Sequence, residues 1–111
     1  MNTSVYNRMV DLKKGMISRE IFSSKEIFEE ELEKVFTRAW LFVGHESQIP
    51  NPGDFFTSRM GAESVILARD KKKKVHVFLN SCRHRGMKVC QYDHGNTQLF
   101  TCPYHSWSYT T

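Results

Sequence analysis

Two short cysteine–histidine pairs constrain this chain more than any other feature of its sequence. Cys82 and His84 are separated by one residue, and Cys102 and His105 are separated by two. Each pair directly follows a run of residues that is typical of a β-strand. Because loops at the ends of neighbouring strands can bring their side chains together, we expect the two pairs to meet at one metal centre.

The chain from residue 39 onward has the pattern of an all-β domain. Short apolar or β-branched runs alternate with turns rich in glycine and proline, and helical periodicity is absent. Strands are expected over residues 40–43, 55–59, 64–68, 75–79 and 97–101. We therefore predict a mostly β fold, an antiparallel sandwich or small barrel, over residues 39–111.

Residues 1–38 follow a different pattern, and we predict a helical leader there. Between Ile27 and Phe36 the apolar residues recur at helical spacing, with glutamates between them. This spacing predicts an amphipathic helix over residues 24–37. Ser23 and Glu26 fit a capping box at its start.

The charge of the chain limits its partners. It has 16 Lys and Arg against 12 Asp and Glu, a net charge of +4, and the excess lies after residue 38. A basic surface attracts nucleic acid or an acidic protein partner. The lysine run at residues 71–74 lacks interleaved aromatic residues, so we interpret it as a solvated hairpin loop and expect no nucleic acid. No apolar run approaches the roughly 20 residues that cross a bilayer, and a cytoplasmic protein without membrane contact is expected.

The distribution of the ligand types bears on the identity of the metal. Two cysteines and two histidines can hold zinc tetrahedrally. Zinc fingers, however, pair cysteine with cysteine and histidine with histidine, whereas each loop here brings one of each. A mixed pair better suits a two-iron cluster in which the thiolates bind one iron and the imidazoles the other. We expect the third cysteine, Cys90, to be a small buried residue and not a ligand.

At these residues the sequence resembles the large (alpha) subunit of aromatic-ring-hydroxylating dioxygenases, in its N-terminal Rieske [2Fe–2S] region. The matching segments are Cys82–Gly86, Cys102–Trp107, Gly95–Asn96, Phe100–Thr101, Phe36–Trp40 and Pro52–Asp54. The resemblance covers about residues 20–111. It implies a Rieske-type antiparallel β-sandwich, and it implies that Cys82, His84, Cys102 and His105 bind the cluster.

The resemblance also implies an enzyme. In that family the cluster relays electrons from a ferredoxin or reductase to a mononuclear Fe(II) in a catalytic domain. There both atoms of O₂ are added to an aromatic ring, and the product is a cis-dihydrodiol. The alpha subunits form oligomers with or without beta subunits. Because this chain stops at Thr111, we expect an N-terminal fragment without catalytic residues of its own and without the closing strands of the sandwich. The main alternative is a small Rieske ferredoxin that only carries electrons.

Several residues beside the ligands carry further expectations. The family usually has glycine at the position of Ser106, so a positive φ there would strain the serine. High-potential Rieske proteins have a disulfide between the positions of Met87 and Tyr104, and without it we predict a potential at the low end of about −150 to +300 mV. Trp107 is expected to pack beneath the cluster loop. Basic residues beside the first pair could guide an acidic electron donor or be ordinary surface charge: Arg83, Arg85 and Lys88.

Overall fold

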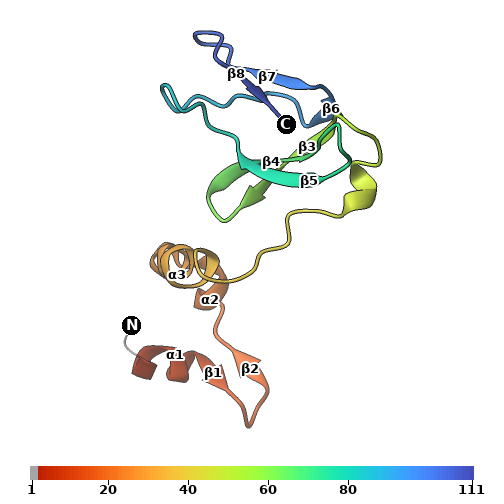
Figure 1. The fold of residues 1–111 in the computed structure, drawn as a ribbon. Helices are drawn as coiled ribbons and strands as arrows, with labels where there is room; N and C mark the ends of the chain where they lie inside the picture. The colour runs from red at the N-terminus through yellow and green to blue at the C-terminus, as the bar shows by residue number, and fades with distance from the viewer. Residues whose placement is uncertain (1–2) are drawn as a thin grey trace. The chain divides into compact units, whose positions relative to one another are not determined.

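The computed structural model describes residues 3–111, which form two compact units. The first unit ends at Ala39, and the second runs from Trp40 to Thr111 (Figure 1). Among the helices of residues 3–111, none has the length and apolar content needed to cross a bilayer.

The first unit consists of short helices and a small hairpin. Helix α1 (Thr3–Met9) leads into strands β1 (Val10–Asp11) and β2 (Met16–Ile17), which pair antiparallel. Helices α2 (Glu20–Ser23) and α3 (Lys25–Glu31) follow, and α3 continues into a π-helical turn, η1 (Leu32–Phe36).

The helix predicted over residues 24–37 is confirmed as the continuous stretch of α3 and η1, but its predicted cap is wrong. Ser24, not Ser23, is the N-cap, and its side chain accepts a 3.3 Å hydrogen bond from the Ile27 N–H. The reason is conformational. Ser23 is the last residue of α2, whereas Ser24 has the extended backbone (φ −76°, ψ 126°) that lets a side chain turn back onto the first turn.

The second unit contains a four-stranded antiparallel sheet and a two-stranded hairpin (Figure 1). The sheet has the order β5-β4-β3-β6, from β3 (Asp54–Met60), β4 (Glu63–Arg69), β5 (Val75–Leu79) and β6 (His94–Asn96). The hairpin pairs β7 (Leu99–Thr101) with β8 (Ser108–Thr110). A 3₁₀ turn, η2 (Glu46–Gln48), precedes β3. The mostly β, antiparallel fold class is thereby confirmed.

Strand β4 forms the centre of the core. Its residues 65–68 are all buried, because β4 lies between β3 and β5 and is covered on both faces. Phe55 of β3 meets Phe100 of β7 edge to face, with ring centroids 5.2 Å apart. Cys82 and Cys102 belong to the same buried cluster. The core therefore anchors the residues at which both candidate ligand loops begin.

The prediction of a short buried strand at residues 40–43 is wrong. In residues 3–111, this segment pairs with no strand, and Trp40 and Phe42 are exposed, Phe42 to 84%. Apolar side chains do not make a strand by themselves, because the backbone N–H and C=O groups also need a neighbouring ladder. These residues instead form part of the connection between η1 and η2.

The lysine run forms the hairpin loop between β4 and β5, as predicted. Residues 71–74 are exposed, and Lys73 adopts a positive φ of 67° at the turn. Asp70 closes the loop: its N–H donates to the Lys74 carbonyl (2.9 Å), and its carboxylate accepts from the Lys74 N–H (2.8 Å).

Candidate metal centre

The first predicted ligand pair lies in a tight loop that follows β5. The Cys82 N–H donates to the Met87 carbonyl (2.7 Å), and the Gly86 N–H donates to the Cys82 carbonyl (2.8 Å). Gly86 has a φ of 76°, in the left-handed region that glycine adopts at little cost. These bonds close a tight turn between Cys82 and Met87, and His84 is one of the residues of this turn.

The second loop repeats this backbone arrangement between β7 and β8. The Cys102 N–H donates to the Trp107 carbonyl (2.8 Å), and the Ser106 N–H donates to the Cys102 carbonyl (2.9 Å). Ser106 has a φ of 63° and stands where Gly86 stands in the first loop. The expectation of a positive φ at this position is therefore confirmed, and the serine is strained.

Replacing Ser106 with glycine is expected to stabilise the domain by about 1 kcal/mol. The left-handed conformation costs a non-glycine residue roughly 1–2 kcal/mol, and the greater freedom of glycine in the unfolded chain offsets part of the gain. Urea unfolding of the cluster-loaded chain measures the difference. Ser108→Gly, in the neighbouring strand β8, is the matched control and should destabilise the chain. Equal changes in the free energy of unfolding in the two variants would contradict the interpretation that Ser106 is strained.

The two loops bring their candidate ligands together by type. The thiols of Cys82 and Cys102 are both buried, and the Cys102 side chain is one of the causes that lower the pKa of Cys82. The rings of His84 and His105 are exposed, with centroids 5.0 Å apart and planes inclined at 72°. The site thus has a buried sulfur pair and an exposed imidazole pair.

Hydrogen-bond donors surround the Cys82 sulfur. The Tyr109 hydroxyl accepts from the Arg83 N–H (3.1 Å), which leaves its own proton free to donate to the Cys82 Sγ at 3.2 Å. The backbone N–H groups of His84 and Arg85 also reach this sulfur. The Tyr109 bond, the largest cause, holds the pKa of Cys82 below its usual value. The same contact raises the pKa of Tyr109.

Sequence reasoning missed Tyr109, although a signal for it was present. Residues 108–110 form the outgoing strand of the second hairpin, and Tyr109 pairs with Phe100, which is buried. Residues directly opposite each other on paired strands share a face, so a strand prediction after Trp107 would have directed Tyr109 toward the core.

Aromatic contacts join the two loops across the site. The Trp107 indole stacks on the His84 ring, with centroids 4.6 Å apart and planes within 11°. The Arg85 guanidinium lies 5.8 Å from the centroid of the Tyr104 ring. Trp107 was expected to pack beneath the loop, but it covers a face of the His84 ring and remains 48% exposed.

The donor set fits a two-iron cluster with unequal irons. Within residues 3–111, no three Cys, His, Asp or Glu side chains converge as a site for a single ion. The four loop donors are instead arranged as two pairs, sulfur with sulfur and imidazole with imidazole. Two thiolates on one iron and two imidazoles on the other are the ligands of a Rieske centre.

Comparison with known families decides the assignment. The profile of the Rieske [2Fe-2S] domain matches residues 39–111, more than half of the chain. The chain belongs to the Rieske [2Fe–2S] domain family. The resemblance to a Rieske region is thereby confirmed.

Similar proteins also confirm the resemblance of this Rieske chain to dioxygenase alpha subunits. It is 48% identical to the biphenyl dioxygenase subunit alpha of Metapseudomonas furukawaii, over 91% of this chain and 22% of the relative. It is 46% identical to a benzene 1,2-dioxygenase subunit alpha of Pseudomonas putida, over 99% of this chain and 24% of the relative. The chain therefore spans less than a quarter of the length of these relatives.

A solved structure agrees with the Rieske fold. The crystal structure of naphthalene 1,2-dioxygenase from Rhodococcus sp. matches with a TM-score of 0.80 and 40% identity. The match covers 86% of this chain and 22% of that one.

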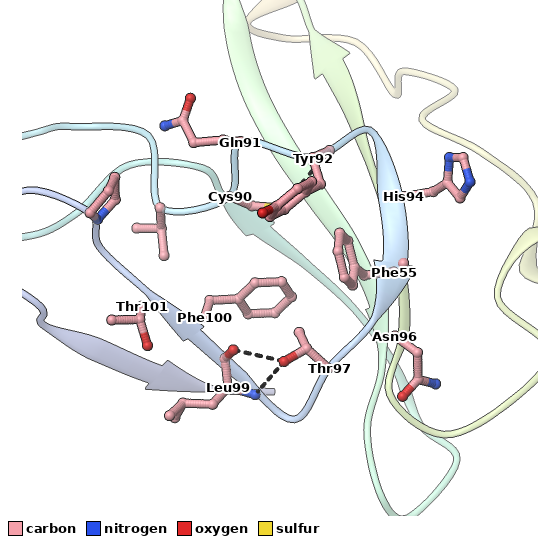
Figure 2. A pocket seen from close by; sticks show the side chains of 13 residues that line it. Phe55, Cys90, Gln91, Tyr92, His94, Asn96, Thr97, Leu99, Phe100 and Thr101 are labelled. Carbon is pink, nitrogen blue, oxygen red and sulfur yellow. Dashed lines mark hydrogen bonds between the residues drawn. The ribbon is translucent and has the colours of Figure 1, made fainter.

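The third cysteine of the Rieske domain lies in an apolar environment. Cys90 is buried at a cavity of about 600 Å³, which Phe55 and Phe100 also line (Figure 2). Its thiol donates to the Tyr92 carbonyl at 3.4 Å, and burial raises its pKa. A raised pKa disfavours the thiolate that metal binding needs.

Proposed function

We propose that this Rieske chain binds a [2Fe–2S] cluster through four residues of the two loops. Cys82 and Cys102 would hold one iron as thiolates, and His84 and His105 would hold the other through one ring nitrogen each. The observation that carries the proposal is the buried thiol pair beside an exposed imidazole pair.

The bound cluster would supply one-electron transfer, and the chain's own residues would set its direction. The cysteines are buried and the histidines are exposed, so electrons would enter and leave on the histidine side. Each imidazole would bind metal through one ring nitrogen and would keep a hydrogen on the other, which would donate to a docked protein. Donors around Cys82 stabilise negative charge on its sulfur and favour the reduced state.

For the whole protein, we propose the role of a ring-hydroxylating dioxygenase alpha subunit. Its cluster would receive electrons from a ferredoxin or reductase and serve a mononuclear Fe(II) site that adds O₂ to an aromatic ring. Association of alpha subunits, with or without beta subunits, is part of this proposal. Support comes from relatives named as alpha subunits of biphenyl and benzene dioxygenases.

The domain organisation belongs to the same proposal. We assign residues 1–38 to a helical leader and residues 39–111 to the Rieske domain. The separate packing of the chain on either side of Ala39 and the family match over residues 39–111 support this division.

Reconstitution with ferrous iron and sulfide tests the cluster directly. The loaded chain should be red-brown, contain two irons and give a rhombic EPR signal on reduction, with two nitrogens coupled to the metal. Cys102→Ser should abolish the signal. Cys90→Ser is the matched control and should keep both irons. A colourless wild-type product, or a spectrum without coupled nitrogen, would refute the assignment.

Exposed positive charge beside the histidines favours an acidic electron donor. Arg83, Arg85 and Lys88 are all exposed around the first loop. Arg85→Glu is expected to slow reduction by an acidic [2Fe–2S] ferredoxin about tenfold at low salt, since steering charges change association rates by one to three orders of magnitude. Stopped-flow absorbance measures this rate.

The salt dependence separates steering from damage to the loop. The difference between Arg85→Glu and wild type should shrink as salt shortens the reach of the charges. Lys72→Glu, an equal change of charge in the β4–β5 loop, is the control. Equal slowing by both variants would show that only the net charge matters.

A further inference from the structure

The two loops of the site are closed at their bases in different ways. The second loop lies between β7 and β8, which pair through Leu99↔Thr110, Phe100↔Tyr109 and Thr101↔Ser108. The first loop follows β5, but the residues that leave it, up to Cys90, form no strand. Within residues 3–111, β5 pairs with β4 alone, so no strand ladder closes the first loop.

A single side chain takes the place of that ladder. The Asn80 Oδ1 accepts from the Cys90 N–H at 2.8 Å, and the Asn80 Nδ2 donates to the Cys90 carbonyl at 2.8 Å. Both backbone groups of Cys90 are therefore satisfied by one amide, as they would be by a residue on a neighbouring strand. Asn80 is 4% exposed and is the one buried polar residue of the described part of the chain.

The amide is itself fixed to the sheet. The Asn80 N–H donates to the Ser64 carbonyl at 2.8 Å, and its Nδ2 makes a longer contact of 3.3 Å with the Ser64 Oγ. Ser64 belongs to β4, whose following residues form the centre of the core. The entrance and the exit of the first loop are thus both tied to the same rigid strand.

We propose that Asn80 is the positioning residue of the first cluster loop. It stands two residues before Cys82, and its bonds to Cys90 hold the loop ends together. In that closed form, the backbone amides of His84 and Arg85 reach the Cys82 sulfur. Without the clamp the ends would separate, and Cys82 and His84 would lose their fixed relation to the second loop. This inference rests on the proposed function, because it assigns the loop to a cluster.

Asn80→Ala tests the clamp in the reconstituted full chain. It leaves the buried N–H and carbonyl of Cys90 without partners, which disfavours the closed loop. We expect the variant to lose its cluster to a chelator about tenfold faster than wild type, with altered EPR g values and broadened nitrogen couplings. Ser64→Ala is the matched control: it removes only the longer contact to Nδ2 and should behave as wild type.

Hydrogen exchange separates a clamp from a general contribution to stability. In Asn80→Ala, the amides of Cys82 and Cys90 should lose protection while those of the β3–β4 ladder keep it. Loss of protection throughout β3–β4, including complete unfolding, would overturn the proposal, because Asn80 would then hold the sheet. Unchanged cluster release and unchanged spectra would also overturn it.

A measurement on the wild-type chain needs neither the variant nor the cluster. The Cys90 amide should be protected to the level of the β7–β8 amides in the metal-free protein, because its partner is buried. Exchange as fast as in the exposed β4–β5 loop would refute the clamp. If the wild-type chain binds no iron but Cys90 is protected, the proposed function fails and the clamp remains as a feature of the fold.

Discussion

Replacing His105 with cysteine is expected to lower the reduction potential of the reconstituted cluster by more than about 100 mV. A third thiolate adds negative charge, so the added electron is less well stabilised; four-cysteine clusters lie near −400 mV, against about −150 to +300 mV for Rieske centres. Protein-film voltammetry measures the midpoint, and EPR should show one coupled nitrogen in place of two.

The control for this substitution is His94→Cys. His94 is an exposed histidine of β6 that takes no part in the ligand pairs, so its variant should keep the wild-type midpoint. A His105→Cys protein with an unchanged midpoint and two coupled nitrogens would show that His105 is not a ligand. His84→Cys should also lower the midpoint potential, because the two loops repeat one backbone arrangement.

Replacing Tyr109 with phenylalanine is expected to lower the potential by about 30–60 mV. The hydroxyl donates to the Cys82 sulfur, and this bond strengthens as the sulfur gains negative charge on reduction. For a one-electron couple, 59 mV corresponds to a tenfold change in the equilibrium constant, which is within the range of one charge-assisted hydrogen bond.

The potential of Tyr109→Phe is best measured beside that of Tyr92→Phe. Tyr92 is 74% exposed, and its removal should leave the midpoint unchanged. A midpoint that rises in Tyr109→Phe would contradict the assignment of the hydroxyl as the donor. If the midpoint falls as expected, the Tyr109 bond partly offsets the low potential predicted from the absence of a disulfide between Met87 and Tyr104.

The candidate ligands could be predicted because their chemistry is written in residue type and spacing. Cysteines and histidines at short separations after strand-like runs point to paired loops. The positive φ at Ser106 was suggested by the resemblance alone, since the family usually has glycine there. Strands β3, β4 and β5 were also predictable, since β-branched and aromatic runs between turns are a local signal.

The remaining features depend on partners that are distant in sequence. Residues 40–43 have the composition of a strand but no ladder to join. The bond between Tyr109 and Cys82 spans 27 residues, and the bonds between Asn80 and Cys90 span ten. Neither contact has a spacing rule, because each arises only when the sheet and the hairpin have formed.

The stacking of Trp107 on His84 gives the chain a built-in optical probe. An iron–sulfur cluster absorbs visible and near-ultraviolet light, so an indole in contact with a proposed cluster ligand should be quenched by energy transfer when the metal binds. The chain has one other tryptophan, the fully exposed Trp40, and Trp107→Phe would isolate its emission. Fluorescence of the unlabelled protein should therefore follow assembly and loss of the metal in real time, at concentrations too dilute for colour to be seen.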